Sequence, residues 1–367
     1  MANKNNNLNS HGAYPRVISR HDLMQILHDG LPAEAQAKLL PNKKVTGVES
    51  TGDGVTVTCA DGSTYTGTII VGADGAHSTV RGQMRTAALQ APLTAASAPV
   101  SANEEKPFLT TYRSMWIRFP TVPPIKPGDA SETHGYDCTL QLFAGEDTSV
   151  IGIYERMDKP TRDGARYTEA DETEFVKRWG HLPVIAGGLS IAEAYKNRTQ
   201  AGMVNLEEGV LRHWSYDRIV LVGDAAHKFT PSTGAGCNNG IVDVVALANE
   251  LYHAFRAVRV ATGDETAFPD KDKILGAFNE YQQARFDTVT DGMNGASQAT
   301  GAATWSDATH RFVDRHILSR DSLVKFFANR NAPVMAKSPV FAYVEGEEQI
   351  VGKFPWAQPI KVSLSSS

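Results

Sequence analysis

Cysteine is scarce in this chain, and its placement excludes two kinds of site. Only Cys59, Cys138 and Cys237 occur among the 367 residues, far apart and odd in number. This pattern excludes a disulfide scaffold and any Cys-x-x-Cys metal site, and it indicates a reducing compartment. No histidines stand at metal-ligand spacing either, so we expect no bound metal.

Concentrated positive charge and long apolar runs are also absent. No segment is rich in Lys and Arg and the formal net charge is -5, which argues against nucleic acid as a partner. No run of roughly eighteen uncharged apolar residues, the length of a membrane span, is present. The polar residues 1–7 lack the apolar core of a secretory signal. We therefore expect a soluble, cytoplasmic protein with no membrane span.

What is present is an ordinary globular composition, with 41% hydrophobic and 21% charged residues and a length that predicts about two domains. The asparagine-rich residues 1–16 are expected to be disordered. Ser19 followed by Asp22 is a typical helix start, and the apolar residues that follow, Leu23, Ile26, Leu27 and Leu31, have helical spacing.

Most of the remaining chain alternates between predicted strands and helices. Asp-Gly turns separate β-rich segments 44–49, 54–59 and 63–65, which predicts a three-stranded antiparallel meander. Further strands are expected at 109–119, 138–143 and 149–154, and helices at 168–179, 241–251, 281–289 and 312–327. In the second of these helices, one apolar face is predicted from Ile241, Val244, Val245, Ala248 and Leu251.

Two apolar runs, 68–75 and 218–224, end in Gly and Asp. Such runs are typical of buried strands in a parallel sheet, and open α/β folds bind ligands at the carboxyl ends of those strands. Asp224 could there accept a hydrogen bond from a ribityl or ribose hydroxyl. Gly234 and Gly236 open the next helix and let backbone N–H groups approach an anion or an electron-rich ring. Their spacing is not G-x-G-x-x-G, so this segment is no nicotinamide fingerprint.

Three motifs stand out in chain order. The first is Ser19-Arg20-x-x-Leu23, and the next is the Asp-Gly motif at 71–81. The third is Gly223-Asp224-Ala225-Ala226-His227 with Pro231 and Gly234-x-Gly236-x-Asn238. Together they resemble FAD-dependent monooxygenases of the aromatic-hydroxylase type, and the third motif, the second flavin motif of that family, resembles fungal natural-product epoxidases and hydroxylases most.

The resemblance implies FAD as cofactor, NAD(P)H as reductant and a small apolar substrate, such as a polyketide or terpenoid, that gains one oxygen by epoxidation or hydroxylation. It implies that Arg20 lies at the phosphate side of the flavin, that Asp224, Gly236 and Cys237 line the flavin, and that Asp74 connects flavin and nicotinamide binding. A turn carboxylate that pairs with Arg81 explains Asp74 equally well.

The implied fold is α/β, with an incomplete Rossmann-like FAD-binding lobe (17–85 and 202–253), a β-rich substrate lobe (86–201) and a helical C-terminal region (254–367). The family's N-terminal G-x-G-x-x-G unit has no match before residue 17. The runs at 68–71 and 218–222 should therefore each lack a neighbouring strand, which predicts exposed apolar surface and a dimer or a complementing N-terminal segment. A flavin-free isomerase or cyclase and a non-catalytic binding subunit remain alternatives.

Other candidate residues have structural explanations beside functional ones. His77 and His227 are expected to make local hydrogen bonds. In the substrate lobe, the family binds substrate with phenols and guanidinium groups, and packing explains the same residues equally well: Tyr112, Arg113, Trp116, Arg118, Tyr136 and Tyr154.

Overall fold

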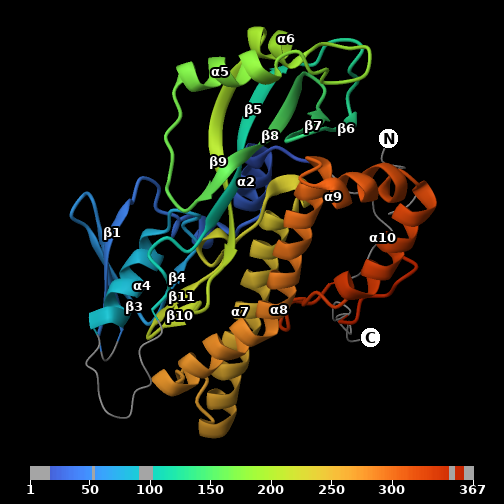
Figure 1. Cartoon of the computed structure of the whole chain (residues 1–367). Helices are drawn as coiled ribbons and strands as arrows, with labels where there is room; N and C mark the ends of the chain where they lie inside the picture. The colour runs from blue at the N-terminus through green and yellow to red at the C-terminus, as the bar shows by residue number, and fades with distance from the viewer. Residues whose placement is uncertain (1–16, 52–53, 91–101, 347–351, 359–367) are drawn as a thin grey trace.

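The computed structural model describes residues 17–51, 54–90, 102–346 and 352–358 (Figure 1). The predicted disordered start at 1–16 and the turn residues 52–53 lie outside these ranges. The described residues mix helices with three sheets, which confirms the predicted α/β class.

A small three-stranded sheet contains both apolar runs that end in Gly-Asp. Its order is β10 (Ser215–Tyr216), β11 (Ile219–Leu221) and β4 (Ile70–Gly72), with β11 parallel to β4 and antiparallel to β10. The prediction that both runs lack a neighbour is therefore wrong for 218–222, because β11 is paired on both sides and completely buried. Among the described strands β4 has one neighbour, and its Val71 side chain is 42% exposed.

A second sheet is the predicted antiparallel meander. It consists of β1 (Val45–Ser50), β2 (Val55–Cys59) and β3 (Thr64–Gly67) in that order. Helix α4 (Thr79–Gln90) follows β4 and packs against both β1 and β11, so it joins the meander to the small sheet. Its buried residues Val80, Met84 and Ala88 lie one turn apart along the helix, as an inward face requires.

The third sheet has six strands and dominates the upper half of Figure 1. Their order is β12 (His227–Lys228), β9 (Gln200–Val210), β5 (Leu109–Pro120), β8 (Thr148–Thr161), β7 (Cys138–Ala144) and β6 (Ala130–His134). Alternate residues of β5, β7 and β8 form an apolar cluster with α5 (Glu169–Trp179) and α6 (Ile191–Lys196), which cover one face. Since β9 belongs to this sheet, the sheet extends past the lobe boundary that we predicted at residue 201.

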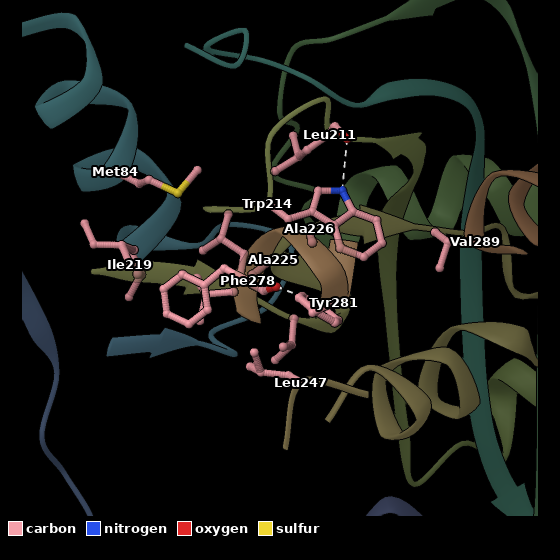
Figure 2. Packing of buried hydrophobic residues seen from close by; sticks show 14 of the residues in the cluster. Met84, Leu211, Trp214, Ile219, Ala225, Ala226, Leu247, Phe278, Tyr281 and Val289 are labelled. Carbon is pink, nitrogen blue, oxygen red and sulfur yellow. Dashed lines mark hydrogen bonds between the residues drawn. The ribbon is translucent and has the colours of Figure 1, made fainter. Parts of the chain in front are cut away.

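Two long helices, α7 (Ala235–Thr262) and α8 (Lys271–Ala303), lie side by side below the six-stranded sheet. Together with β11 they enclose a core in which Trp214, Phe278 and Tyr281 are fully buried (Figure 2). The polar atoms of Trp214 and Tyr281 have backbone partners: Trp214 Nε1 donates to Leu211 O at 3.0 Å, and the Tyr281 hydroxyl donates to Leu221 O at 3.1 Å.

The N-terminal helix, α2 (Arg20–Asp29), begins as predicted, because the Ser19 hydroxyl accepts a hydrogen bond from Asp22 N at 3.0 Å. Its predicted apolar face is not buried, and Ile26 and Leu27 are exposed. A short helix, α3 (Ala33–Gln36), follows it.

Two helix predictions need correction. In α7, Ile241 and Val244 of the predicted buried face are exposed, and the inward face carries Asp243 and Asn249 instead. The predicted single helix at 312–327 is divided into α9 (Ala308–Val313), a π-helical turn (Asp314–Leu318) and α10 (Asp321–Met335).

Candidate functional site

Two aspartates follow the paired parallel strands at the same edge of the small sheet. Asp74 comes two residues after β4, and Asp224 lies in the 3-10 turn Gly223–Ala225 directly after β11. Both turns need glycine, because Gly75 and Gly223 have φ of 83° and 58°. This placement is where open α/β sheets bind ligands.

The Asp74 carboxylate accepts its hydrogen bonds from residues at the start of α4. It accepts hydrogen bonds from the Ser78 hydroxyl at 2.5 Å and from Val80 N at 3.1 Å, as a helix-capping carboxylate does. Arg81 donates to Ala225 O at 3.0 Å and to Ala76 O at 2.5 Å, and burial lowers the pKa of its guanidinium. Arg81 thus ties the Asp74 turn to the Asp224 turn through backbone carbonyls.

A cavity of about 580 Å³ lies between the Asp224 turn and the open face of the six-stranded sheet. It brings together Arg20, the first residue of α2, and the exposed carboxylate of Asp224, which are 204 positions apart. Its remaining lining is contributed by His77, Ser114, Trp116, Phe143, Val150, Ile151, Gly152, Tyr154, Gly164, Ala165, Met203, Val204, Asn205, Leu206, Glu207, Lys228, Phe229 and Pro231. Asp74, Gly236 and Cys237 do not line it.

Gly236 and Cys237 nevertheless lie beside this cavity, in the first turn of α7. A Cβ atom placed on Gly236 would be 4.0 Å from Asp224 Oδ1, so the glycine borders the same carboxylate. Helix α7 has no side-chain cap, and the amide groups of its first turn are left for a ligand or solvent. The Cys237 side chain is exposed.

The wall opposite Asp224 is formed by paired residues of β5 and β8. Ser114 stands opposite Tyr154, and Trp116 stands opposite Gly152. Glycines make room for the two rings: a Cβ atom at Gly152 would meet the Tyr154 hydroxyl at 3.0 Å, and one at Gly202 would meet the Trp116 indole at 3.0 Å. This part of the wall is therefore aromatic and built on two paired strands.

A hydrogen-bonded chain fixes this wall to the loop before α7. The Tyr154 hydroxyl donates to Gln141 Oε1 at 2.8 Å, and Gln141 Nε2 donates to Ser232 O at 3.0 Å and to Glu132. Burial, with the nearby Glu132 charge, raises the pKa of Tyr154 above its usual value, so the phenol keeps its proton. Tyr154 is thus a donor that is held in place rather than a base.

One ion pair lies at the cavity between β9 and β12. Lys228 Nζ lies 3.1 Å from Glu207 Oε2, and both side chains are mostly buried. With Arg20 and Asp224, these groups give the cavity a charged part of its lining, and Trp116, Phe143 and Leu206 add apolar side chains.

Sequence reasoning missed a buried polar cluster behind the Asp224 turn. The Asp243 carboxylate accepts hydrogen bonds from His227 Nε2 at 2.6 Å, Gly223 N at 3.0 Å and Arg285 Nε at 2.9 Å. Arg285 also donates to Asn239 Oδ1 at 2.7 Å. Burial acts to raise the pKa of Asp243, but hydrogen bonds and the charges of His227 and Arg285 hold it below its ordinary value. A polar residue at 243 inside an apolar helix was the available signal.

The other predicted candidates are spread over the molecule. Of the two histidines, His227 is buried in the cluster just described, whereas His77 is exposed at the cavity and makes no hydrogen bond to any described residue.

Of the six substrate-lobe candidates, Trp116 and Tyr154 line the cavity. The Tyr112 hydroxyl lies 3.2 Å from Thr304 Oγ1, Arg113 is paired with Glu155, and Tyr136 packs on Trp305. Arg118 lies outside the cavity lining.

The described residues contain no helix that is long and apolar enough to cross a membrane. Within the same ranges, no group of three His, Cys, Asp or Glu side chains could hold a metal ion.

Comparison with known proteins gives consistent matches. The family described as an FAD binding domain matches residues 1–263, in agreement with the resemblance that the three motifs indicated. FAD-dependent monooxygenase BOA8 of Botryotinia fuckeliana is 29% identical over 293 residues, covering 79% of this chain and 37% of its own. FAD-dependent monooxygenase spyC of Aspergillus fumigatus is 31% identical over 280 residues, covering 75% and 57%. The chain thus spans between a third and three fifths of the length of these relatives.

A solved structure shares the fold. Klebsiella pneumoniae HpxO, complexed with FAD and uric acid, superposes with a TM-score of 0.61 at 18% identity, covering 88% of this chain and 73% of its own.

Proposed function

Because the chain belongs to the FAD binding domain family, we propose that it is an FAD-dependent monooxygenase that inserts one oxygen atom into an apolar secondary metabolite. Epoxidation or hydroxylation of a polyketide or terpenoid fits this description. The observation that carries the proposal is the cavity, whose lining combines charged residues, among them Arg20 and Asp224, with the aromatic residues Trp116 and Tyr154. Relatives named FAD-dependent monooxygenases support it.

The charged residues of the cavity and the start of α7 suit FAD. Asp224 is exposed and can accept a hydrogen bond from a ribityl or ribose hydroxyl. The guanidinium of Arg20 and the uncapped amide groups of α7 suit a phosphate oxygen. Gly236 keeps the approach to Asp224 free of a side chain, since a Cβ atom there would already contact the carboxylate.

FAD that is reduced by NAD(P)H supplies the activation of molecular oxygen when it is bound. This chain's own residues bind and orient the substrate. The rings of Trp116 and Tyr154 exclude water from their side of the cavity, which strengthens polar interactions inside it. Because its pKa is raised, the Tyr154 phenol stays protonated and can donate a hydrogen bond to a substrate carbonyl or hydroxyl, if the bond to Gln141 is given up.

The cofactor part is tested by titrating the purified 367-residue chain with FAD and measuring flavin fluorescence. Asp224→Asn should raise the dissociation constant about tenfold, as the loss of one charged hydrogen bond does. Asp287→Asn is the matched control, since Asp287 is an exposed aspartate of α8 that does not line the cavity. If the wild-type chain is colourless once unbound FAD has been removed, the proposal is overturned.

The reaction part is tested by incubating the FAD-loaded chain with NADPH or NADH, oxygen and a panel of apolar polyketides and terpenoids. A product that gains one oxygen atom supports monooxygenation. A product of unchanged mass overturns it in favour of a flavin-free isomerase or cyclase, and the absence of turnover favours a binding subunit.

A further inference from the structure

The carboxylate of Asp243 connects three parts of the chain that are separate in sequence. Asp243 lies in α7 and is fully buried. It accepts hydrogen bonds from Gly223 N in the turn after β11, from His227 Nε2 in β12, and from Arg285 Nε in α8. A buried carboxylate with three donors is well satisfied, and it resists displacement because each donor would otherwise lose its partner.

The bond to Gly223 bears directly on the candidate cofactor site. Gly223 adopts φ of 58° and approaches α7 so closely that a Cβ atom on it would lie 3.5 Å from Gly240 Cα. Asp243 is one helical turn beyond Gly240, so its side chain reaches back to the Gly223 amide. The next residue in the chain is Asp224, whose carboxylate lines the cavity.

His227 fixes the other end of the same segment. Its ring is fully buried, donates to Asp243 and lies between Trp214 and Phe229, with centroid distances of 5.3 Å to each. Residues 223 and 227 are therefore both held by one carboxylate, with Asp224 between them. Arg285 balances the charge that this burial leaves in the core.

We propose that Asp243 is a positioning residue for the cofactor site, because its carboxylate fixes the segment 223–227 so that Asp224 points toward a hydroxyl of the bound flavin nucleotide. The inference rests on the proposed function. Asp243 does not line the cavity and acts only through the backbone of Gly223 and the ring of His227.

The test compares Asp243→Asn with Asn249→Ala in the full 367-residue chain. The first change keeps the size of the side chain but turns one of its acceptor atoms into a donor that faces other donors. Asn249 is the matched control: it is also buried on α7, and it hydrogen-bonds Val340 O at 2.8 Å and Ala342 N at 2.7 Å, away from the Asp224 turn.

Hydrogen exchange measures the positioning without any cofactor. Asp243→Asn should speed exchange of the Gly223 amide about tenfold, whereas Asn249→Ala should leave it unchanged. Equal exchange of this amide in wild type and Asp243→Asn overturns the inference. If Asp243→Asn does not fold, Arg285→Lys, which keeps the charge but loses the Nε donor, should give a smaller change of the same sign.

FAD titration measures the consequence for binding. Asp243→Asn should raise the FAD dissociation constant about tenfold, and combining it with Asp224→Asn should add little, because both changes remove the same contact. Fully additive effects overturn the inference and indicate a general structural role. A wild-type chain that binds no FAD overturns the proposed function, while the exchange measurement still decides whether Asp243 holds the turn.

Discussion

A substitution at Gly72 tests the contact that sets the two aspartate turns beside each other. Gly72 is the last residue of β4, where the strand lies against both β11 and α4. A Cβ atom there would be 2.7 Å from Leu221 Cδ2, 2.8 Å from Val80 Cγ1 and 2.9 Å from Val80 Cβ. These separations are far below the roughly 3.5–4.0 Å at which carbon atoms attract each other.

The neighbours of Gly72 cannot easily move away. Leu221 is completely buried in the core around Trp214, and Val80 is β-branched and buried at 4% exposure, so its Cβ moves only with the backbone of α4. Overpacking of this kind costs about 1–3 kcal/mol. We therefore expect Gly72→Ala to lower the midpoint of thermal unfolding by several degrees, since about 1 kcal/mol shifts it by roughly 2–4 °C in domains of about 150–250 residues.

The matched control is Gly82→Ala, ten residues further on. Gly82 lies inside α4 and is exposed, and a Cβ atom added to it would meet no neighbouring group within 4 Å. Replacing a helical glycine by alanine stabilises by about 0.5–1 kcal/mol, so this variant should unfold at a higher temperature than wild type. Calorimetry of the three proteins decides the matter. A Gly72→Ala protein as stable as wild type would refute the close approach of β4, β11 and α4.

Three further outcomes are expected. Phe278→Ala removes a fully buried ring from the core in Figure 2 and should destabilise the protein by about 3–5 kcal/mol in urea unfolding; a loss below about 1 kcal/mol would contradict that packing. Since the pKa of Asp243 lies below its ordinary 3.8, its carboxylate contributes stability that is present above that value and lost as pH falls through the lower folded-state pKa. Thermal unfolding measured from about pH 6 to pH 3 should therefore fall more steeply in wild type than in Asp243→Asn, and parallel curves would count against this. Of the three thiols, the exposed Cys237 should react with a disulfide reagent in the native protein and be protected by FAD. Cys59 and Cys138 are buried, burial raises the pKa of Cys138 to about 12, and both should react only after unfolding; equal reactivity of all three would be inconsistent with their burial.

The local signals in the sequence were sufficient where short-range chemistry decides the structure. The Ser19 cap of α2 forms as predicted, and Thr168 caps α5 in the same way, because a hydroxyl and the amide three residues on are neighbours in any conformation that starts a helix. The Gly-Asp motif at 223–224 was a second reliable local signal. Gly223 has a positive φ, so the glycine marks the turn that ends the strand and places Asp224 at its carboxyl end.

Strand β9 shows where such signals were too weak. Its sequence contains Gly202, Glu207 and Gly209, which are poor strand formers, so no strand was expected there. The strand forms because its backbone is paired on both sides, with β5 and with β12, and because Glu207 is paired with Lys228. These partners lie far away in the chain, and a local pattern contains no information about them.

Helix α7 gives the physical reason for the error that mattered most to the site. The prediction assumed that the apolar residues of a helix share its buried face, which holds when burial is driven by transfer of apolar surface from water. In α7 the inward face also carries Asp243 and Asn249, whose side chains hydrogen-bond the backbone of the Gly223 turn and of the segment at 340–342. Where a helix must hold irregular backbone, the buried N–H and C=O groups of that backbone need polar partners, and an apolar face cannot supply them. The polar interruptions of an otherwise apolar helix are thus the positions to test first for residues that shape a neighbouring site.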